Sequence, residues 1–142
     1  MAITKQSIDG VAFENLQVGQ LLPSYTKPPI TKVQLVKYAG ASGDFNPLHT
    51  DDEFAQKIGM QGVIAHGMLV MGFLGEYVMK LVGDVAQVKQ FSMRFGAMTV
   101  PGDAITCTAQ VKEINEGEVV LELTAQKQDQ TVVGSGKATL SF

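Results

Sequence analysis

The apolar run at residues 63–82 constrains the fold more than any other part of this sequence. From Met68 onward its apolar side chains would occupy every face of a helix, which is typical of a helix that protein surrounds on most sides. Glu76 and Lys80 lie within the run, and it would be the chain's one candidate membrane span. We therefore predict a buried central helix, ended by Gly83, rather than a segment that crosses a membrane.

The sequence after this helix changes to the two-residue alternation of β-strands. Four short segments alternate apolar and polar residues, with turn sequences at residues 100–103 and 115–117. Consecutive strands with short connections predict an antiparallel meander. The central helix would cover its apolar face, so the predicted class is α+β. The side chains expected to face inward are Phe91, Met93 and Phe95; Ile105, Cys107, Ala109 and Val111; Val119, Leu121, Leu123 and Ala125; and Val132, Gly134, Gly136, Ala138, Leu140 and Phe142.

The composition is that of a globular protein small enough to form one domain over residues 1–142. The net charge is −3 and basic residues form no stripe, so we expect neither nucleic acid nor a membrane surface as a partner. Cys107 is the only cysteine, which excludes an intramolecular disulfide and disfavours a thiolate metal cluster. The first residues lack the pattern of a signal peptide, so we expect a cytoplasmic location.

Two short helices are expected upstream of the central helix. Thr31 begins a capping-box pattern, which predicts a helix that ends near Gly40. Thr50 and Glu53 form a second capping-box pattern, which predicts another short helix. Residues 41–50, between these helices, combine glycine and proline with aspartate and asparagine. These residue types favour turns, so we predict a loop there.

The loop contains the strongest candidates for catalytic residues in the sequence, Asp44 and His49. A carboxylate and an imidazole together form an acid–base couple that works near neutral pH. The alternative is structural: Asp44 would bond backbone amides of the loop, and His49 would fill a polar niche. The residues alone leave both interpretations open.

A second pair, His66 and Gly67, begins the central helix. A glycine in the first turn exposes its N–H without side-chain obstruction, and the helix dipole adds partial positive charge there. Gly67 would either hold a carbonyl oxygen that becomes an oxyanion or simply permit close packing of helix on sheet. For His66 we favour a structural role, as a helix-start histidine bonded to the backbone.

Four residues of this region offer possible metal ligands, namely Asp44, His49, Asp51 and His66. Their spacing matches no standard zinc pattern, so we expect no metal. No cofactor is expected either. The seven methionines mostly follow core positions and indicate an adaptable apolar interior.

Two segments of the chain resemble a known family. The residues YAGASGDFNPLH at positions 38–49, followed by IAHGM at positions 64–68, closely resemble the MaoC-like dehydratases. That family includes (R)-specific enoyl-CoA hydratases and (3R)-hydroxyacyl-ACP dehydratases. The resemblance extends over nearly the whole chain, because the strand that contains Phe95 and the turn at residues 100–103 also look like the family's. It departs at Gly75, where some family hydratases carry a serine, which leaves the preferred acyl length open.

The resemblance implies a hotdog fold, in which a curved antiparallel sheet wraps the long helix, usually as a dimer. It also implies roles for individual residues. Asp44 and His49 would be the catalytic pair, and the N–H of Gly67 would bind the thioester oxygen. Asn46 and Met68 would lie at the substrate, with Asn46 helping to hold the loop and the water.

The activity that the resemblance implies is the interconversion of trans-2-enoyl and (3R)-3-hydroxyacyl thioesters of CoA or ACP. Hydration requires a base, an acid and stabilisation of an enolate-like oxygen, which Asp44, His49 and Gly67 offer. By the resemblance, the pair would flank one water, so the new C–O and C–H bonds would form on the same face. The partners expected are an acyl-CoA or acyl-ACP substrate and a second subunit, identical or related. The alternatives are a thioesterase on the same fold and the active subunit of a heterodimeric dehydratase.

Overall fold

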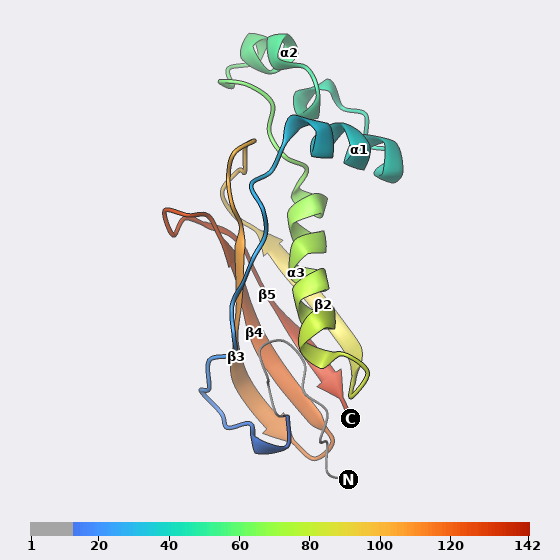
Figure 1. Ribbon diagram of the computed structural model, residues 1–142, viewed down its shortest axis with the longest axis vertical. Coiled ribbons are helices and arrows are strands. Elements are labelled where there is room, and N and C mark those ends of the chain that lie inside the picture. Colours follow the sequence, from blue (N-terminus) through green and yellow to red (C-terminus); the bar gives the residue numbers. More distant parts are fainter. Residues whose placement is uncertain (1–12) are drawn as a thin grey trace.

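The computed structural model describes residues 13–142, which form a helix layer on a sheet layer (Figure 1). The long helix α3 lies across one face of a five-stranded sheet, and the two shorter α-helices gather beyond one end of it. The prediction that the first residues do not form a signal peptide concerns residues outside this described range. The helices are α1 (Lys32–Ser42), α2 (Asp52–Lys57) and α3 (Gly67–Val82), the 3-10 turns are η2 (Phe13–Asn15) and η3 (Pro47–His49), and the strands are β1 (Tyr25–Thr26), β2 (Gln87–Phe95), β3 (Thr106–Asn115), β4 (Glu118–Gln126) and β5 (Val132–Ser141).

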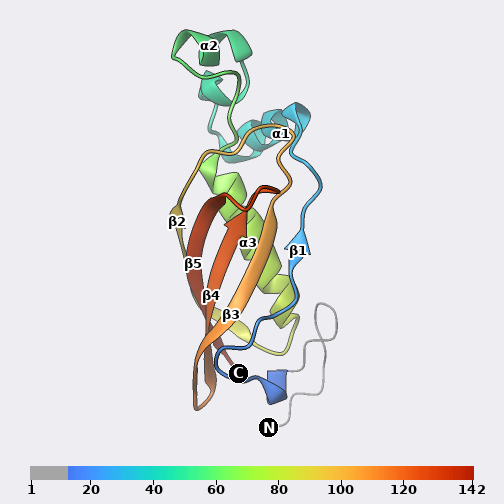
Figure 2. The ribbon, with the colours of Figure 1, turned by 90° about the vertical axis from the view of Figure 1, so that its left-hand side faces the viewer.

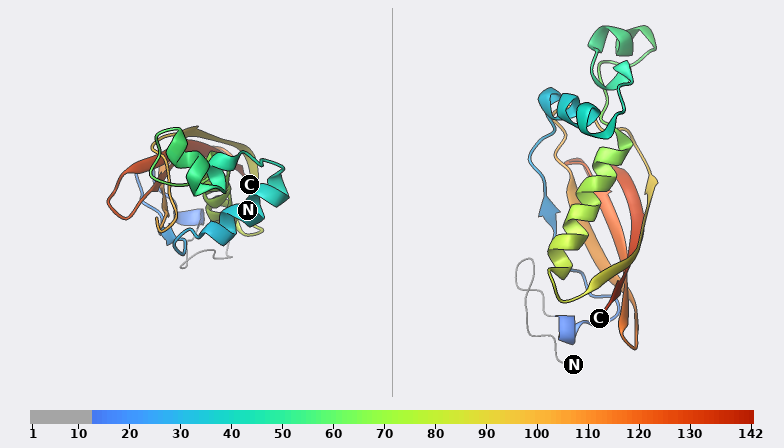
Figure 3. Two further views of the ribbon diagram at one scale, coloured as in Figure 1. Left: turned by 90° about the horizontal axis from the view of Figure 1, so that it is seen from above. Right: turned by 90° about the vertical axis from the view of Figure 1, so that its right-hand side faces the viewer.

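Helix α3 forms the centre of the apolar core, as the sequence predicts. Its buried side chains include Phe73 and Tyr77, and the helix ends at Gly83. The inward faces predicted for β3 and β4, at residues 107–111 and 121–125, are buried. The sheet curls around the helix (Figures 2 and 3), which confirms the α+β class. Within residues 13–142, no helix combines the length and apolarity that a membrane span requires.

The order of the strands differs from the predicted four-strand meander. Strands β3, β4 and β5 pair in sequence, but β2 pairs with β5, and the order is β1-β3-β4-β5-β2. The connection from β2 to β3 is a crossing over the end of the sheet. Along it, the Thr99 carbonyl accepts from Ala65 N–H and the Asp103 carbonyl accepts from Ile30 N–H. These distant contacts hold the crossing, and a hairpin between β2 and β3 is therefore not formed.

One residue of β5 faces the opposite way from the prediction. Val132 is 44% exposed, whereas Val133 is 3% exposed. The pairing of β4 with β5 shifts between Ala125 and Gln126. An irregularity of this kind adds a residue to one strand and reverses which side chains point inward. Beyond it Ala138 is buried, as predicted.

Helix α1 begins where Thr31 predicts, because the side chain of Thr31 accepts a hydrogen bond from Gln34 N–H. It continues past Gly40 to Ser42. Gly43, with φ of 78°, takes the left-handed conformation that ends the helix. The loop is therefore shorter than predicted and begins at this glycine.

Helix α2 is capped by Asp51, so the capping box predicted at Thr50 is wrong. Oδ1 of Asp51 accepts hydrogen bonds from the N–H groups of Glu53 and Phe54. Thr50 is the C-cap of the preceding 3-10 turn η3, and its N–H donates to the Pro47 carbonyl. The helix start therefore lies one residue later than the pattern indicated.

Candidate functional site

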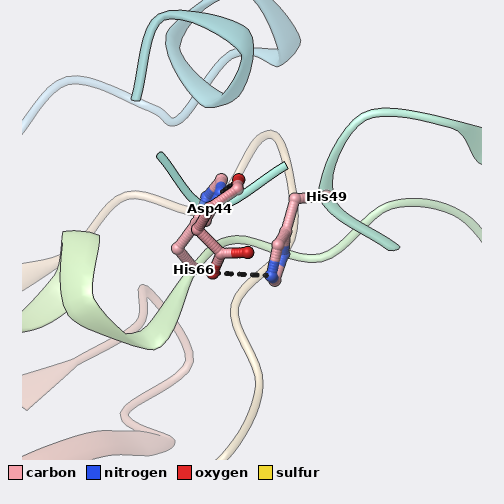
Figure 4. Close-up of side chains that lie close together, drawn as sticks. All are labelled: Asp44, His49 and His66. Carbon is pink, nitrogen blue, oxygen red and sulfur yellow. Dashed lines mark hydrogen bonds and ion pairs between the residues drawn. The ribbon is translucent and has the colours of Figure 1, made fainter. Parts of the chain in front are cut away.

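Side chains from three segments meet at the start of α3 (Figure 4). Asp44 lies in the loop after α1, His49 ends η3, and His66 immediately precedes α3. One polar atom from each side chain lies within 4.8 Å of the others. The structure therefore brings the predicted pair together and adds His66, which the sequence assigned to the scaffold.

Hydrogen bonds within the loop orient Asp44. Its N–H lies 3.2 Å from Ser42 Oγ, and its Oδ1 accepts from Asn46 N–H at 3.3 Å. Oδ1 of Asn46 in turn accepts from Leu48 N–H at 3.0 Å and caps η3. Asn46 thus shapes the loop, as predicted. The structural interpretation of Asp44 holds for Oδ1, whereas Oδ2 faces His49.

His49 is held by one ring nitrogen and presents the other. Its Nδ1 lies 2.8 Å from the Ile64 carbonyl, and because a carbonyl only accepts, Nδ1 carries the hydrogen. In the neutral ring, Nε2 therefore has a free lone pair. Nε2 lies 3.8 Å from Oδ2 of Asp44, which is too long for a direct hydrogen bond and suits one water bonded to both atoms.

His66 is 2% exposed and contacts both members of this pair. Its Nε2 lies 3.2 Å from the main-chain carbonyl of Asp44. Its ring stacks on that of His49, with centroids 3.8 Å apart, and meets the ring of Tyr38 edge-on. Burial lowers the pKa of His66. The predicted hydrogen bond from His66 to the backbone is present. The stacking of His66 on His49 depends on the tertiary fold, which no local sequence pattern predicts. The sequence indicated only that both histidines lie near Asp44 along the chain.

Gly67 is the first residue of α3 and lines, together with His49, a cavity of about 180 Å³. In the described part of the chain, no side chain caps this helix start. The first N–H groups of the helix therefore keep their partial positive charge available for a ligand. The cavity is lined by His49, Ile64, Ala65, Gly67, Val70, Phe95, Gly96, Ala97, Met98, Thr99 and Val133.

Met68 and Phe95 lie differently with respect to this cavity. Met68, a predicted substrate contact, is 56% exposed and is not one of the lining residues. Phe95, predicted to face the core, is 53% exposed. Its ring lies over Gly67 at the end of β2 and lines the cavity instead.

Asp44, His49 and His66 are also the residues that could hold a metal ion. The two imidazole rings, however, lie at an interplanar angle of only 25°. Imidazole lone pairs lie in the ring plane, so in nearly parallel stacked rings they point side by side and do not converge on one ion. Asp51, the fourth residue considered, caps α2 instead. The arrangement favours proton transfer over metal coordination.

Comparison with known proteins finds similarity over most of the chain. The model of the MaoC like domain matches residues 15–133. The (R)-specific enoyl-CoA hydratase of Rhodospirillum rubrum is 32% identical over 130 residues, which cover 90% of this chain and 89% of that protein. The fatty acid synthase beta subunit TOXC of Cochliobolus carbonum is 34% identical over 107 residues, which cover 72% of this chain and 5% of that protein. The chain thus spans nearly all of one relative and a small part of another.

A solved structure extends this similarity to the fold. The R-hydratase PhaJ1 from Pseudomonas aeruginosa, in its unliganded form, superposes with a TM-score of 0.82 at 27% sequence identity. The match covers 91% of this chain and 83% of that one. The hotdog fold that the sequence resemblance implied is confirmed.

Proposed function

We propose that this chain, which belongs to the MaoC-like domain family, interconverts trans-2-enoyl and (3R)-3-hydroxyacyl thioesters. Both the family and the geometry of the site support this proposal. The observation that carries the proposal is the separation of 3.8 Å between Asp44 Oδ2 and His49 Nε2 beside the start of α3. The similarity to the (R)-specific enoyl-CoA hydratase of Rhodospirillum rubrum supports the substrate class.

The proton steps use the gap between Asp44 and His49. A water in this gap loses a proton to one member of the pair while its oxygen bonds to the β-carbon of the enoyl group. The other member, which holds the pair's one exchangeable proton at the start, delivers it to the α-carbon. The pair ends with the proton count with which it began, so the reaction balances without a further reactant. Because both groups act from one side, the C–O and C–H bonds form on the same face.

The start of α3 binds the thioester oxygen. Negative charge moves onto this oxygen as water attacks the β-carbon, and the N–H of Gly67 carries the partial positive charge of a helix N-terminus. Gly67 and His49 line the same cavity, which supports a single site for the thioester and the water.

The substrates proposed are acyl-CoA or acyl-ACP thioesters, and the active form proposed is a dimer. A second copy of this chain or a related subunit would complete it. Since this chain has both Asp44 and His49, it would be the active subunit of a heterodimer. Light scattering and assay of the purified chain distinguish the two: an active dimer supports the homodimer, and an inactive chain that a related subunit activates supports the heterodimer.

The test is hydration of crotonyl-CoA, followed by loss of ultraviolet absorbance, with chiral analysis of the product. We expect Asp44→Asn and His49→Ala each to lose about a hundredfold or more in kcat/KM. Asp51→Asn is the matched control, because asparagine caps a helix as well as aspartate does, and it should keep its activity. Full activity in both site variants, or a (3S) product, would overturn the proposal.

The same reaction distinguishes hydration from thioester hydrolysis. Hydrolysis releases the thiol of CoA, which DTNB detects, whereas hydration leaves the thioester intact. We expect absorbance to fall without thiol release. Thiol release at the rate of the absorbance change would instead identify a thioesterase.

A further inference from the structure

We propose that His66 is a positioning residue for the Asp44–His49 pair. As a neutral imidazole protonated at Nε2, it ties the main chain of Asp44 to the start of α3, and its ring is the surface on which His49 stacks. It thereby holds Oδ2 of Asp44 and Nε2 of His49 at the separation that fits one water. This inference rests on the proposed function for its kinetic consequence.

The hydrogen-bond partners of His66 assign its tautomer. Nε2 lies 3.2 Å from the Asp44 carbonyl, which accepts only, so this nitrogen must carry the hydrogen. Over residues 13–142, Nδ1 is buried and has no hydrogen-bond partner. A second hydrogen there would create a buried cation without an acceptor, which is far more costly than a buried lone pair. The ring is therefore neutral.

The stacking of His66 on His49 makes the neutral state of His66 important for the pair. The rings of His49 and His66 have centroids 3.8 Å apart, so two imidazolium ions there would repel each other strongly. Only one of the two histidines can therefore carry a positive charge at a time. The groups that face His66 are Tyr38 from α1, Asp44 from the loop and His49 from η3. Because His66 stays neutral, His49 is free to accept a proton.

The ring of His49 is constrained in two directions. The Ile64 carbonyl holds it in the ring plane through Nδ1, and His66 supports its face. Asp44 is likewise held at three points: Ser42 Oγ accepts from its N–H, His66 donates to its carbonyl, and its Oδ1 accepts from an amide. Oδ2 is left to face His49. His66 thus contacts both Asp44 and His49.

Two substitutions separate the hydrogen bond from the ring. His66→Phe keeps an aromatic ring without a donor, and His66→Gln keeps an N–H donor at the reach of Nε2 without a ring. We expect His66→Phe to lower kcat for crotonyl-CoA about tenfold or more with KM within about twofold, because displaced catalytic groups slow chemistry more than binding. His66→Gln should recover much of the loss. Tyr38→Phe, which keeps the ring packed on His66, is the matched control and should behave as the unmodified protein does.

Each kinetic outcome decides the matter when thermal unfolding shows that the variants are folded. Unchanged kcat in His66→Phe, or no recovery in His66→Gln, would overturn the proposal. A rise in KM at constant kcat would also overturn it, because it would indicate a role in shaping the substrate pocket.

Nitrogen NMR of the imidazole rings tests the geometry without reference to activity. The chain has two histidines, so single variants assign both rings. We expect His66 to remain neutral with Nε2 protonated between pH 5 and 8. If crotonyl-CoA is not hydrated but this signature is found, the proposed function fails and the assignment of His66 stands. If the protein is active but His66 titrates or carries its hydrogen on Nδ1, the inference about His66 fails.

Discussion

The ring of Phe95 packs over Gly67 so closely that a β-carbon at Gly67 would lie 3.1 Å from two of the ring carbons. A contact this short forces the ring or the helix start to move by a few tenths of an ångström. Gly72, further along the same helix, has no atom within 4 Å of the corresponding position. The two glycines are therefore a matched pair for substitution.

We expect Gly67→Ala to lower kcat/KM about tenfold or more, because the methyl group and the displaced ring intrude on the proposed oxygen-binding position. Gly72→Ala should keep its activity and gain up to about 1 kcal/mol of stability, because alanine is the better helix former. Thermal unfolding of both variants excludes misfolding as the cause. Equal activities would contradict the role proposed for Gly67.

The cap of α2 offers a test of local stability. Asp51→Ala removes the acceptor for the N–H groups of Glu53 and Phe54, and we expect a loss of about 0.5–2 kcal/mol. Thr50→Ala should change the free energy of unfolding by less than about 0.5 kcal/mol, because its side chain does not cap the helix. Hydrogen exchange of the two amides reports the local effect. Similar exchange in both variants would contradict the assignment.

Cys107 should be inert in the native protein. It is fully buried, and burial, together with the carboxylate of Glu76, raises the pKa of its thiol to about 12. The thiolate is the reactive form, so we expect no reaction with DTNB at pH 8 until the protein is unfolded, when one thiol per chain reacts. This keeps the protein's own signal out of the thiol-release assay. Rapid reaction of the native protein would show that strand β3 is accessible.

The carboxyl group of Asp103 should make the free energy of unfolding depend on pH in the acid range. Burial alone would raise the pKa of its carboxyl, but hydrogen bonds from Val100 N–H and Gln128, with the ammonium of Lys127, hold that pKa below 3.8. A lowered pKa in the folded state stabilises the fold fully above pH 3.8, and this contribution is lost as the pH falls through the folded-state value.

Asp103→Asn should therefore cost about 1–3 kcal/mol at pH 7, and the deficit should shrink in acid. Thermal unfolding between pH 2 and 7 measures it, with the exposed Glu116→Gln as the control. A deficit that is the same at every pH would contradict the ion-pair explanation.

The parts of the fold that could be predicted are those encoded by neighbouring residues. The apolar run predicts α3, and alternation predicts the inward faces of β3 and β4. In a regular helix or strand, side chains that recur at the period of the backbone point to the same side, so the sequence alone indicates which side is buried. The cap at Thr31 follows from the same kind of local rule. The cap predicted at Thr50 was wrong, because Thr50 ends the 3-10 turn before α2 and Asp51 caps the helix instead.

The parts that could not be predicted depend on contacts between distant segments. Alternation says which face of a strand is buried, but any strand edge can accept any partner, so the pairing of β2 with β5 was not visible. The shift in register that turns Val132 outward arises from the same pairing of distant strands.

The candidate site divides along the same line. The sequence by itself determined a loop with Asp44 and His49 and a helix start at Gly67, because turn formers, caps and an apolar run act within a few residues. Only the tertiary structure decided that His66 lies against His49 at 3.8 Å and binds the Asp44 carbonyl. Such distances result from how the loop packs on the end of α3, and packing is a property of the whole core.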